Sequence, residues 1–225
     1  MNVYLVGAKN PETRRQVLAQ QSADPGFVVA GFIDNDPSKR GTTFLDLPVL
    51  GGVDVVSQLL VDDPDARFVN LITGSTAARF QVSLQLAELG CVFTNLIHPE
   101  VDLTDVSVGT GNYVQNGVVV QAGALIGDNV GLHFRSLIAH ETTIGSSSFV
   151  GPGATISGEV HVGDGVFIGA NATVIPRVRI GRWATVGAGA VITRDVPDHA
   201  TVVGNPAKVI RTDPPTRTSG DISPR

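Results

Sequence analysis

His140 and Glu141 stand side by side in the stretch RSLIAHETTIG, and both residue types can take part in proton transfer. A histidine has an unperturbed pKa near 6.5, so it can accept a proton at neutral pH and act as a general base. A neighbouring carboxylate can hold the imidazole in one tautomer and stabilise its charged form. The pair therefore predicts a general base, His140, oriented by Glu141. The alternative is a pair of polar residues at a solvated corner.

A six-residue period surrounds this pair. From Val108 to Ile192 every sixth residue is aliphatic, fifteen in a row without exception. The fourth residue after each aliphatic is nearly always small or β-branched, with Asn112 as the one exception, and glycine often follows the aliphatic directly. Such a repeat is typical of a parallel β-helix, in which three units of one short strand and one corner close a triangular coil. Fifteen repeats of six residues therefore predict five coils of eighteen residues.

The period assigns each position of the repeat a place in the coil. We expect the aliphatic to point inward and to stack on its counterpart one coil away, and the glycine after it to tolerate the corner dihedrals. His140 and Glu141 follow Ile138 by two and three residues, which predicts a corner for both, pointing away from the interior. Gly158 comes eighteen residues after His140, so we expect it one coil above, with an N–H group open to a developing oxyanion.

The first part of the chain alternates β-rich runs with helical patterns. We expect strands at 3–7, 27–34, 68–73 and 91–97, and helices around Val17 and Leu18, over 53–60 and over 77–89. This order predicts a small parallel α/β sheet, whose ligands bind at the carboxyl ends of the strands, here after Gly7 and after Asp34. Asn10, followed by Pro11, predicts a helix start whose free N–H groups, with Lys9, can attract a phosphate. A helix cap without a ligand is the alternative.

The charge balance and the cysteine content exclude several classes of function. The chain has 16 basic and 21 acidic residues, and a formal charge of -5 argues against nucleic acid or an anionic membrane as the main partner. The N-terminus has no signal-peptide pattern and no apolar run could span a bilayer, so we expect a cytoplasmic protein. Cys91 is the only cysteine, which excludes an internal disulfide and favours a buried thiol over a nucleophile.

Four stretches carry a resemblance to a known family. They are GFIDNDPSKRG with LPVLGG (31–52), TNLIHPEV (94–101), IAHETTIG (138–145) and GAGAVITRDVPDHATVVGNPAKVIR (187–211). The chain resembles the left-handed β-helix (hexapeptide-repeat) acyltransferases, and most of all the bacterial nucleotide-sugar N-acetyltransferases of the sialic-acid and bacillosamine type. The resemblance implies a small parallel Rossmann-like nucleotide-binding domain over 1–98 and a left-handed β-helix of about five coils with a C-terminal cap over 99–211. For 212–225 we expect a disordered tail.

The resemblance also implies an activity and a site. It implies a homotrimer with an active site between two β-helices, acetyl-CoA as donor, the amino group of a nucleotide-linked sugar as acceptor, and no metal. His140 would then promote direct attack of the amine on the thioester, with Glu141 beside it. The implied donor contacts are Gly158, Phe149, Gly169, Ala170, Gly187 and Ala188. The implied contacts of the nucleotide sugar are Gly7, Lys9, Asp34, Asn35, Asp36 and His133.

Some residues depart from the family pattern and leave alternatives open. The first loop, VGAKNPETRR, retains only Gly7 of a glycine-rich loop, and Phe149 stands where the family often has histidine. O-acetylation of a hydroxyl acceptor and a non-catalytic trimeric nucleotide-binding scaffold are therefore alternatives. The β-helix carbonic anhydrases need three histidines on one zinc ion. Their close histidine pair is absent, because His133 and His161 lie seven residues before and twenty-one residues after His140.

Overall fold

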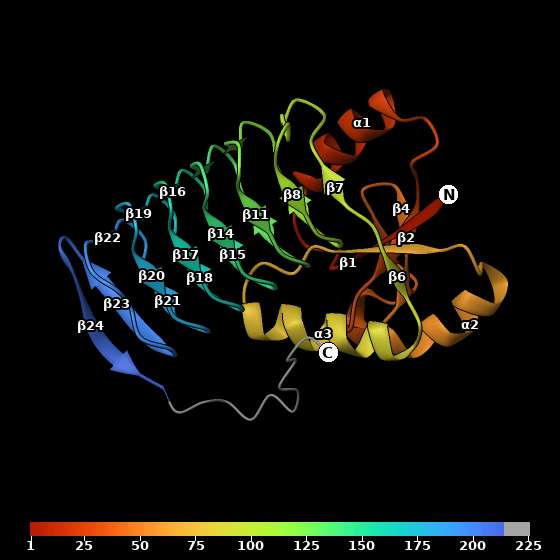
Figure 1. Ribbon diagram of the computed structural model, residues 1–225. Coiled ribbons are helices and arrows are strands. Elements are labelled where there is room, and N and C mark those ends of the chain that lie inside the picture. Colours follow the sequence, from red (N-terminus) through yellow and green to blue (C-terminus); the bar gives the residue numbers. More distant parts are fainter. Residues whose placement is uncertain (214–225) are drawn as a thin grey trace.

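The computed structural model describes residues 1–213 and shows an α/β unit followed by a ladder of short strands (Figure 1). The α/β unit comprises β1 (Asn2–Val6), α1 (Thr13–Ala23), β2 (Val28–Ile33), η1 (Pro37–Lys39), β3 (Thr43–Phe44), β4 (Leu47–Gly51), η2 (Val53–Val55), α2 (Val56–Asp62), β5 (Arg67–Asn70), α3 (Thr76–Glu88) and β6 (Val92–Phe93). The ladder comprises β7 (Leu96–Ile97), β8 (Ser107–Val108), β9 (Tyr113–Val114), β10 (Val119–Val120), β11 (Leu125–Ile126), β12 (Gly131–Leu132), β13 (Leu137–Ile138), β14 (Thr143–Ile144), β15 (Phe149–Val150), β16 (Thr155–Ile156), β17 (His161–Val162), β18 (Phe167–Ile168), β19 (Thr173–Val174), β20 (Arg179–Ile180), β21 (Thr185–Val186), β22 (Val191–Ile192), β23 (Ala200–Gly204) and β24 (Ala207–Thr212).

The N-terminal sheet has the strand order β3-β4-β2-β1-β5-β6 and is parallel except for the β3–β4 pair. Helix α1 packs on one face through Val17, and α2 and α3 pack on the other through Leu59 and Leu86 (Figure 1). Strand β1 lies between β2 and β5, so the chain reverses direction across the sheet at β1. Ligand clefts form at the carboxyl ends of strands at such a reversal.

The predicted parallel sheet is confirmed, with two differences at its edge. Strands β3 and β4 were not predicted, because β3 has only two residues and β4 carries Pro48, which weakens a strand pattern. The run 91–97 was predicted as one strand, but it divides into β6, which joins the N-terminal sheet, and β7, which pairs with β9 of the ladder. One apolar run therefore contributes to both sheets.

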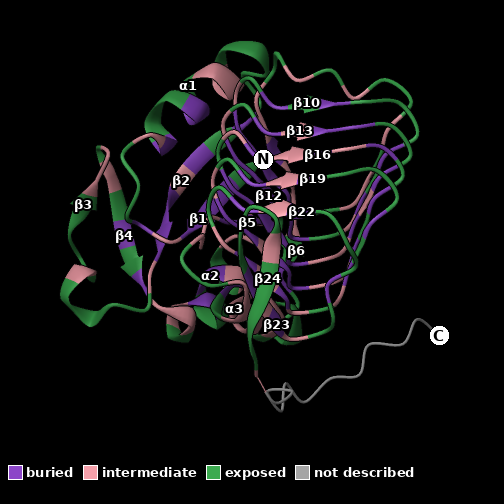
Figure 2. Cartoon of the chain, turned by 90° about the vertical axis from the view of Figure 1, so that its left-hand side faces the viewer, coloured by how far each residue is buried: buried purple, intermediate pink, exposed green. Residues whose placement is uncertain are grey.

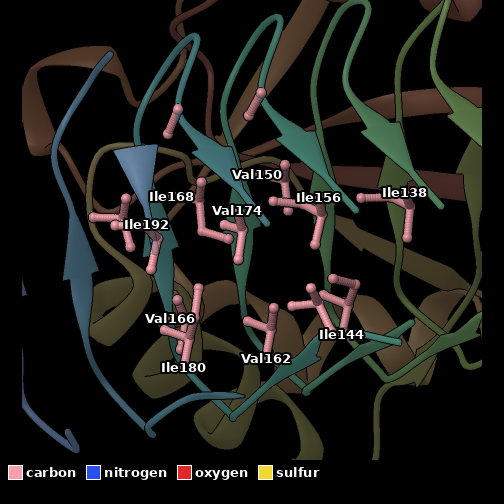
Figure 3. Packing of buried hydrophobic residues seen from close by; sticks show 14 of the residues in the cluster. Ile138, Ile144, Val150, Ile156, Val162, Val166, Ile168, Val174, Ile180 and Ile192 are labelled. Carbon is pink, nitrogen blue, oxygen red and sulfur yellow. The ribbon is translucent and has the colours of Figure 1, made fainter. Parts of the chain in front are cut away.

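The ladder is the predicted parallel β-helix. Each of the fifteen aliphatics occupies the second position of a strand, from Val108 in β8 to Ile192 in β22. Strands pair with the strand eighteen residues away, as in Ile138 with Ile156. The aliphatics point into the interior, where they form one continuous buried cluster (Figure 3). Burial of this cluster is the main stabilising interaction between coils.

The β-helix has three faces, which we number in chain order. Face 1 is the sheet that runs from β24 to β7 and includes β9, β12, β15, β18 and β21. Face 2 contains β10, β13, β16, β19 and β22, and face 3 contains β8, β11, β14, β17 and β20. Leu96 and Tyr113 of face 1 belong to the cluster that also contains Val17 of α1, so face 1 adjoins the N-terminal unit. The edge between faces 2 and 3 therefore lies on the opposite side of the prism.

The predicted role of the glycine after each aliphatic is wrong. Left-handed backbone occurs three residues after the aliphatic, at every sixth residue from Asp105 to Gly189. The glycines directly after the aliphatic do not have positive φ. They are required for space, since a Cβ on Gly145 would lie 2.5 Å from the carbonyl carbon of Gly163 and 2.6 Å from the nitrogen of Asp164 in the next coil.

The C-terminal end of the β-helix is covered by the antiparallel hairpin of β23 and β24, which extends face 1 (Figure 1). Thr212, the last residue of β24, pairs with Ala200. The remainder of the predicted tail, from 214 on, lies outside the described residues. Within residues 1–213, no helix combines the length and apolarity needed to cross a bilayer.

Candidate active site

His140 lies at the edge between faces 2 and 3, in the turn after β13. The turn is fixed by its neighbouring coils, because Gln121 Oε1 accepts from the His140 N–H at 3.0 Å and the His140 carbonyl accepts from the Glu159 N–H at 3.0 Å. The imidazole itself is 58% exposed. In Figure 2 the coil corners are largely green, whereas the strands contain the purple, buried positions. His140 is therefore a reactive type of side chain on a rigid and accessible edge.

Glu141 is the left-handed residue of the same corner, with φ of 55°. Its Oε2 lies 3.7 Å from His140 Nδ1, and the Glu141 side chain is 70% exposed. This separation exceeds a hydrogen bond, so no direct hydrogen bond joins the two side chains. Closure of the gap by a few tenths of an ångström would give the hydrogen bond of a base and its orienting carboxylate.

Gly158 lies one coil above His140, as the register of β13 and β16 requires. A Cβ on Gly158 would meet His140 Nε2 at 2.5 Å, so the ring lies directly over this glycine. Among residues 1–213, no group accepts a hydrogen bond from the Gly158 N–H. The edge therefore brings together a proton acceptor and an uncommitted N–H donor, which are the two groups that acyl transfer needs.

A cleft of about 660 Å³ lies at the carboxyl ends of β1, β2 and β5. Four of the predicted substrate residues line it, namely Gly7, Lys9, Asp34 and Asn35. Its charged residues are Lys9, Asp34 and Lys39, two cations and one anion, in a chain with a net charge of -5. This balance favours an anionic ligand.

The Asp34 carboxylate forms hydrogen bonds with three groups around the cleft. Its Oδ2 accepts from the Ala8 N–H at 2.8 Å and from Lys39 Nζ at 2.7 Å, and its Oδ1 accepts from the Asp36 N–H at 2.9 Å. Burial is the largest influence on the pKa of Asp34 and raises it, but these three donors together hold that pKa below its ordinary value. Asp36 does not line the cleft. Its carboxylate instead accepts from the N–H and hydroxyl of Ser38 and starts η1.

The expectation of free N–H groups at the start of α1 is wrong. The helix begins at Thr13, and Asn10 Oδ1 accepts from the Glu12 N–H at 3.0 Å. The N–H groups of Thr13 and Arg14 donate to the carbonyls of Asn10 and Pro11. The first turn therefore has its donors already occupied.

His133 and Phe149 lie in an aromatic stack on face 1. The His133 ring is 5.7 Å from Tyr113 and 4.6 Å from Phe149, and Phe149 stacks on Phe167 at 4.9 Å. Gly131 adjoins this stack, since a Cβ there would lie 3.4 Å from Phe149 and 3.9 Å from His133. His133 is buried and is not among the residues that line the cleft. Burial lowers its pKa to about 4, with a further contribution from the charge of Arg79, and its Nε2 has no partner in the described chain.

The remaining predicted donor contacts lie at a different edge from His140. Gly169, Ala170, Gly187 and Ala188 follow the face 1 strands β18 and β21, at the edge between faces 1 and 2. The cleft adjoins face 1 through Tyr113 and does not include His140. One chain therefore does not bring the imidazole, these small residues and the cleft together.

The sequence prediction missed the loop from β5 to α3. Ile72, Thr73, Gly74 and Ser75 line the cleft, and Ser75 caps α3 by accepting from the Ala78 N–H at 3.2 Å. The signal was present as ITGST, a strand end followed by glycine and a serine N-cap. Lys39 was missed as well, although it lies only five residues after Asp34, to which its Nζ donates at 2.7 Å.

Within residues 1–213, no cluster of three His, Cys, Asp or Glu side chains could hold a metal ion. Cys91 is buried, and burial raises the pKa of its thiol to about 11, which keeps it protonated.

Comparison with known proteins agrees with these observations. Residues 159–194 match the family model described as bacterial transferase hexapeptide (six repeats). Perosamine N-acetyltransferase (PerB) from Caulobacter crescentus, solved with CoA and GDP-perosamine, is 30% identical over 93% of this chain and 97% of that chain, with a TM-score of 0.81. The acetyltransferase domain of PglB from Neisseria gonorrhoeae, solved with acetyl coenzyme A, is 29% identical over 93% and 98%, with a TM-score of 0.77. Comparison with curated protein sequences finds no significant match.

A hexapeptide β-helix joined to an α/β unit, similar over 93% of the chain to acetyltransferases solved with CoA or acetyl coenzyme A, defines an acyltransferase. The chain belongs to the left-handed β-helix acyltransferases of the hexapeptide-repeat family.

Proposed function

We propose that the protein is an acetyl-CoA-dependent N-acetyltransferase that acts on the amino group of a nucleotide-linked amino sugar. The similarity to PerB supports this proposal most, since it extends over 93% of the chain and includes both the cleft and the β-helix. PerB was solved with CoA and GDP-perosamine together. Lys9 lines the cleft and forms no ion pair within residues 1–213, so its charge suits the diphosphate of such an acceptor.

The edge residues support a single-step transfer. The amine nitrogen of the acceptor attacks the thioester carbonyl, and His140 accepts a proton from that nitrogen during the attack. A C–N bond forms, the C–S bond breaks, and the proton on the imidazole neutralises the departing thiolate. The Gly158 N–H stabilises the oxyanion that develops on the carbonyl oxygen, and the Glu141 carboxylate favours the charged imidazole.

We infer that two chains of a homotrimer complete each site. His140 lies opposite face 1, whereas the cleft and the small residues of the edge between faces 1 and 2 lie beside face 1. A second copy can bring its own cleft or edge to the exposed imidazole, and a cyclic trimer repeats that contact three times.

Thiol release from acetyl-CoA, followed with a panel of amino-sugar nucleotides, tests the proposal. We expect one member to give turnover that falls by about 10² to 10⁴ in His140→Ala, the usual contribution of a general base. Hydroxyl-bearing sugar nucleotides in the same panel test the O-acetylation alternative. Absence of His140-dependent turnover with every acceptor would refute the enzyme and favour the scaffold.

A further inference from the structure

The start of α3 differs from the start of α1 in its free hydrogen-bond donors. Among the described residues, no group accepts from the N–H groups of residues 73–77, which cover the β5–α3 loop and the first two positions of α3. The neighbouring donors are occupied, because Ile72 N–H donates to Asn70 Oδ1 and Ala78 N–H donates to Ser75 Oγ. The free N–H groups thus form one continuous run beside the cleft.

Arg79 places a buried positive charge against this run. Its side chain is 0% exposed and is aimed back at the start of its own helix, where Nη1 donates to the Ile72 carbonyl at 3.0 Å. Nε donates to the Asn129 carbonyl at 2.6 Å, and Nη2 has no partner within residues 1–213. No carboxylate in the described chain forms an ion pair with Arg79.

The charge of Arg79 therefore remains uncompensated next to the cleft wall. Its influence reaches His133, whose pKa is lowered first by burial and then by this charge. The α3 macrodipole adds positive potential at the same end of the helix. Gly74 leaves the approach open, since a Cβ there would have no neighbour within 4 Å.

We propose that the β5–α3 loop and the first turn of α3, residues 73–77, bind the diphosphate of the nucleotide sugar, with Arg79 supplying positive charge from behind. The inference rests on the proposed function and names the phosphate site within the same cleft. The β1–α1 loop keeps a single glycine, and its helix start has no free donors. We place the phosphate site on the third helix because the donors at the start of the first helix are occupied, and Lys9 lines the same cleft.

Thr76 allows a test that spares the fold. It is the first residue of α3, where proline is well tolerated and removes an N–H that has no partner in the protein. Ser75 already has extended backbone, with φ of -158° and ψ of 123°, which suits a residue before proline. Thr76→Val is the matched control, because it lacks the hydroxyl as proline does but keeps the N–H.

The experiment measures, by calorimetry on the full-length protein, the affinities for UDP, GDP, inorganic pyrophosphate and the two free nucleosides. We expect Thr76→Pro to bind its diphosphate ligand about tenfold more weakly than Thr76→Val, as loss of one charge-assisted hydrogen bond implies. Affinity for the nucleoside and the thermal unfolding midpoint should be equal in both variants.

Two other outcomes overturn the inference in different ways. Equal diphosphate affinities in the two variants, with wild-type binding intact, would refute the α3 site and leave the proposed function standing. Absence of nucleotide and pyrophosphate binding by the wild-type protein would refute both the site and the proposed nucleotide acceptor.

Discussion

Gly158→Ala tests the geometry of the proposed site with the addition of one carbon atom. The new Cβ would lie 2.5 Å from His140 Nε2 and 2.6 Å from Cε1, while ordinary van der Waals contact begins near 3.4 Å. The imidazole must therefore move by about 0.9 Å, and a displacement of about 1 Å at a catalytic group costs about 10²-fold in rate. The backbone N–H of residue 158 remains, so the loss would arise from the ring alone.

The fold should tolerate this substitution. Gly158 does not have positive φ, and the atoms that Cβ would meet belong to the end of an exposed side chain that can rotate. We expect the thermal midpoint to change little and kcat for thiol release to fall about a hundredfold. Ser157→Ala, one residue earlier, is the control and should keep wild-type activity. A Gly158→Ala enzyme as active as wild type would contradict the placement of catalysis at this edge.

Three further predictions follow from the structure. His133 titrates near pH 4 in the folded chain against an ordinary 6.5, so wild-type stability should fall by about 3 kcal/mol as the pH drops from 6.5 to 4. Denaturant unfolding of His133→Phe should show a much flatter pH dependence, and an equal slope would exclude the buried imidazole as its cause. Gly145→Ala should lower the free energy of unfolding by about 1–3 kcal/mol, because its Cβ would overlap the backbone of Gly163, and an unchanged urea midpoint would contradict the spatial role of this glycine. Co-assembly of inactive His140→Ala and Asp34→Ala chains should restore about a quarter of the sites if two chains build each one. A mixture as inactive as its parents would indicate a site within one chain.

The β-helix could be predicted almost completely from sequence, because its fold repeats one local rule. The side chain of each aliphatic from Val108 to Ile192 meets its counterpart one coil away, so a single period fixes register, burial and corner positions together. The role of glycine could not be read in the same way. The missing side chain of Gly145 leaves room for the backbone of the next coil. Residue type alone does not reveal such a contact between coils.

Only the parts of the candidate site that follow the six-residue repeat could be predicted from the sequence. The register alone puts Gly158 over His140. By contrast, the buried position of His133 depends on ring contacts with Tyr113 and Phe149 from the neighbouring coils. The unpaired guanidinium of Arg79 depends on contacts with a coil fifty residues away, and such long-range packing is invisible to local patterns.

The eighteen-residue coil gives the molecule a modular length. Each coil adds about 4.8 Å along the axis, and the hairpin of β23 and β24 covers whichever coil comes last. Duplication or deletion of one coil beyond Gly158 would therefore lengthen or shorten the track available to a long thin donor, while the imidazole and its glycine keep their relative positions. The length of the surface available to the donor can thus evolve independently of the catalytic residues at the edge.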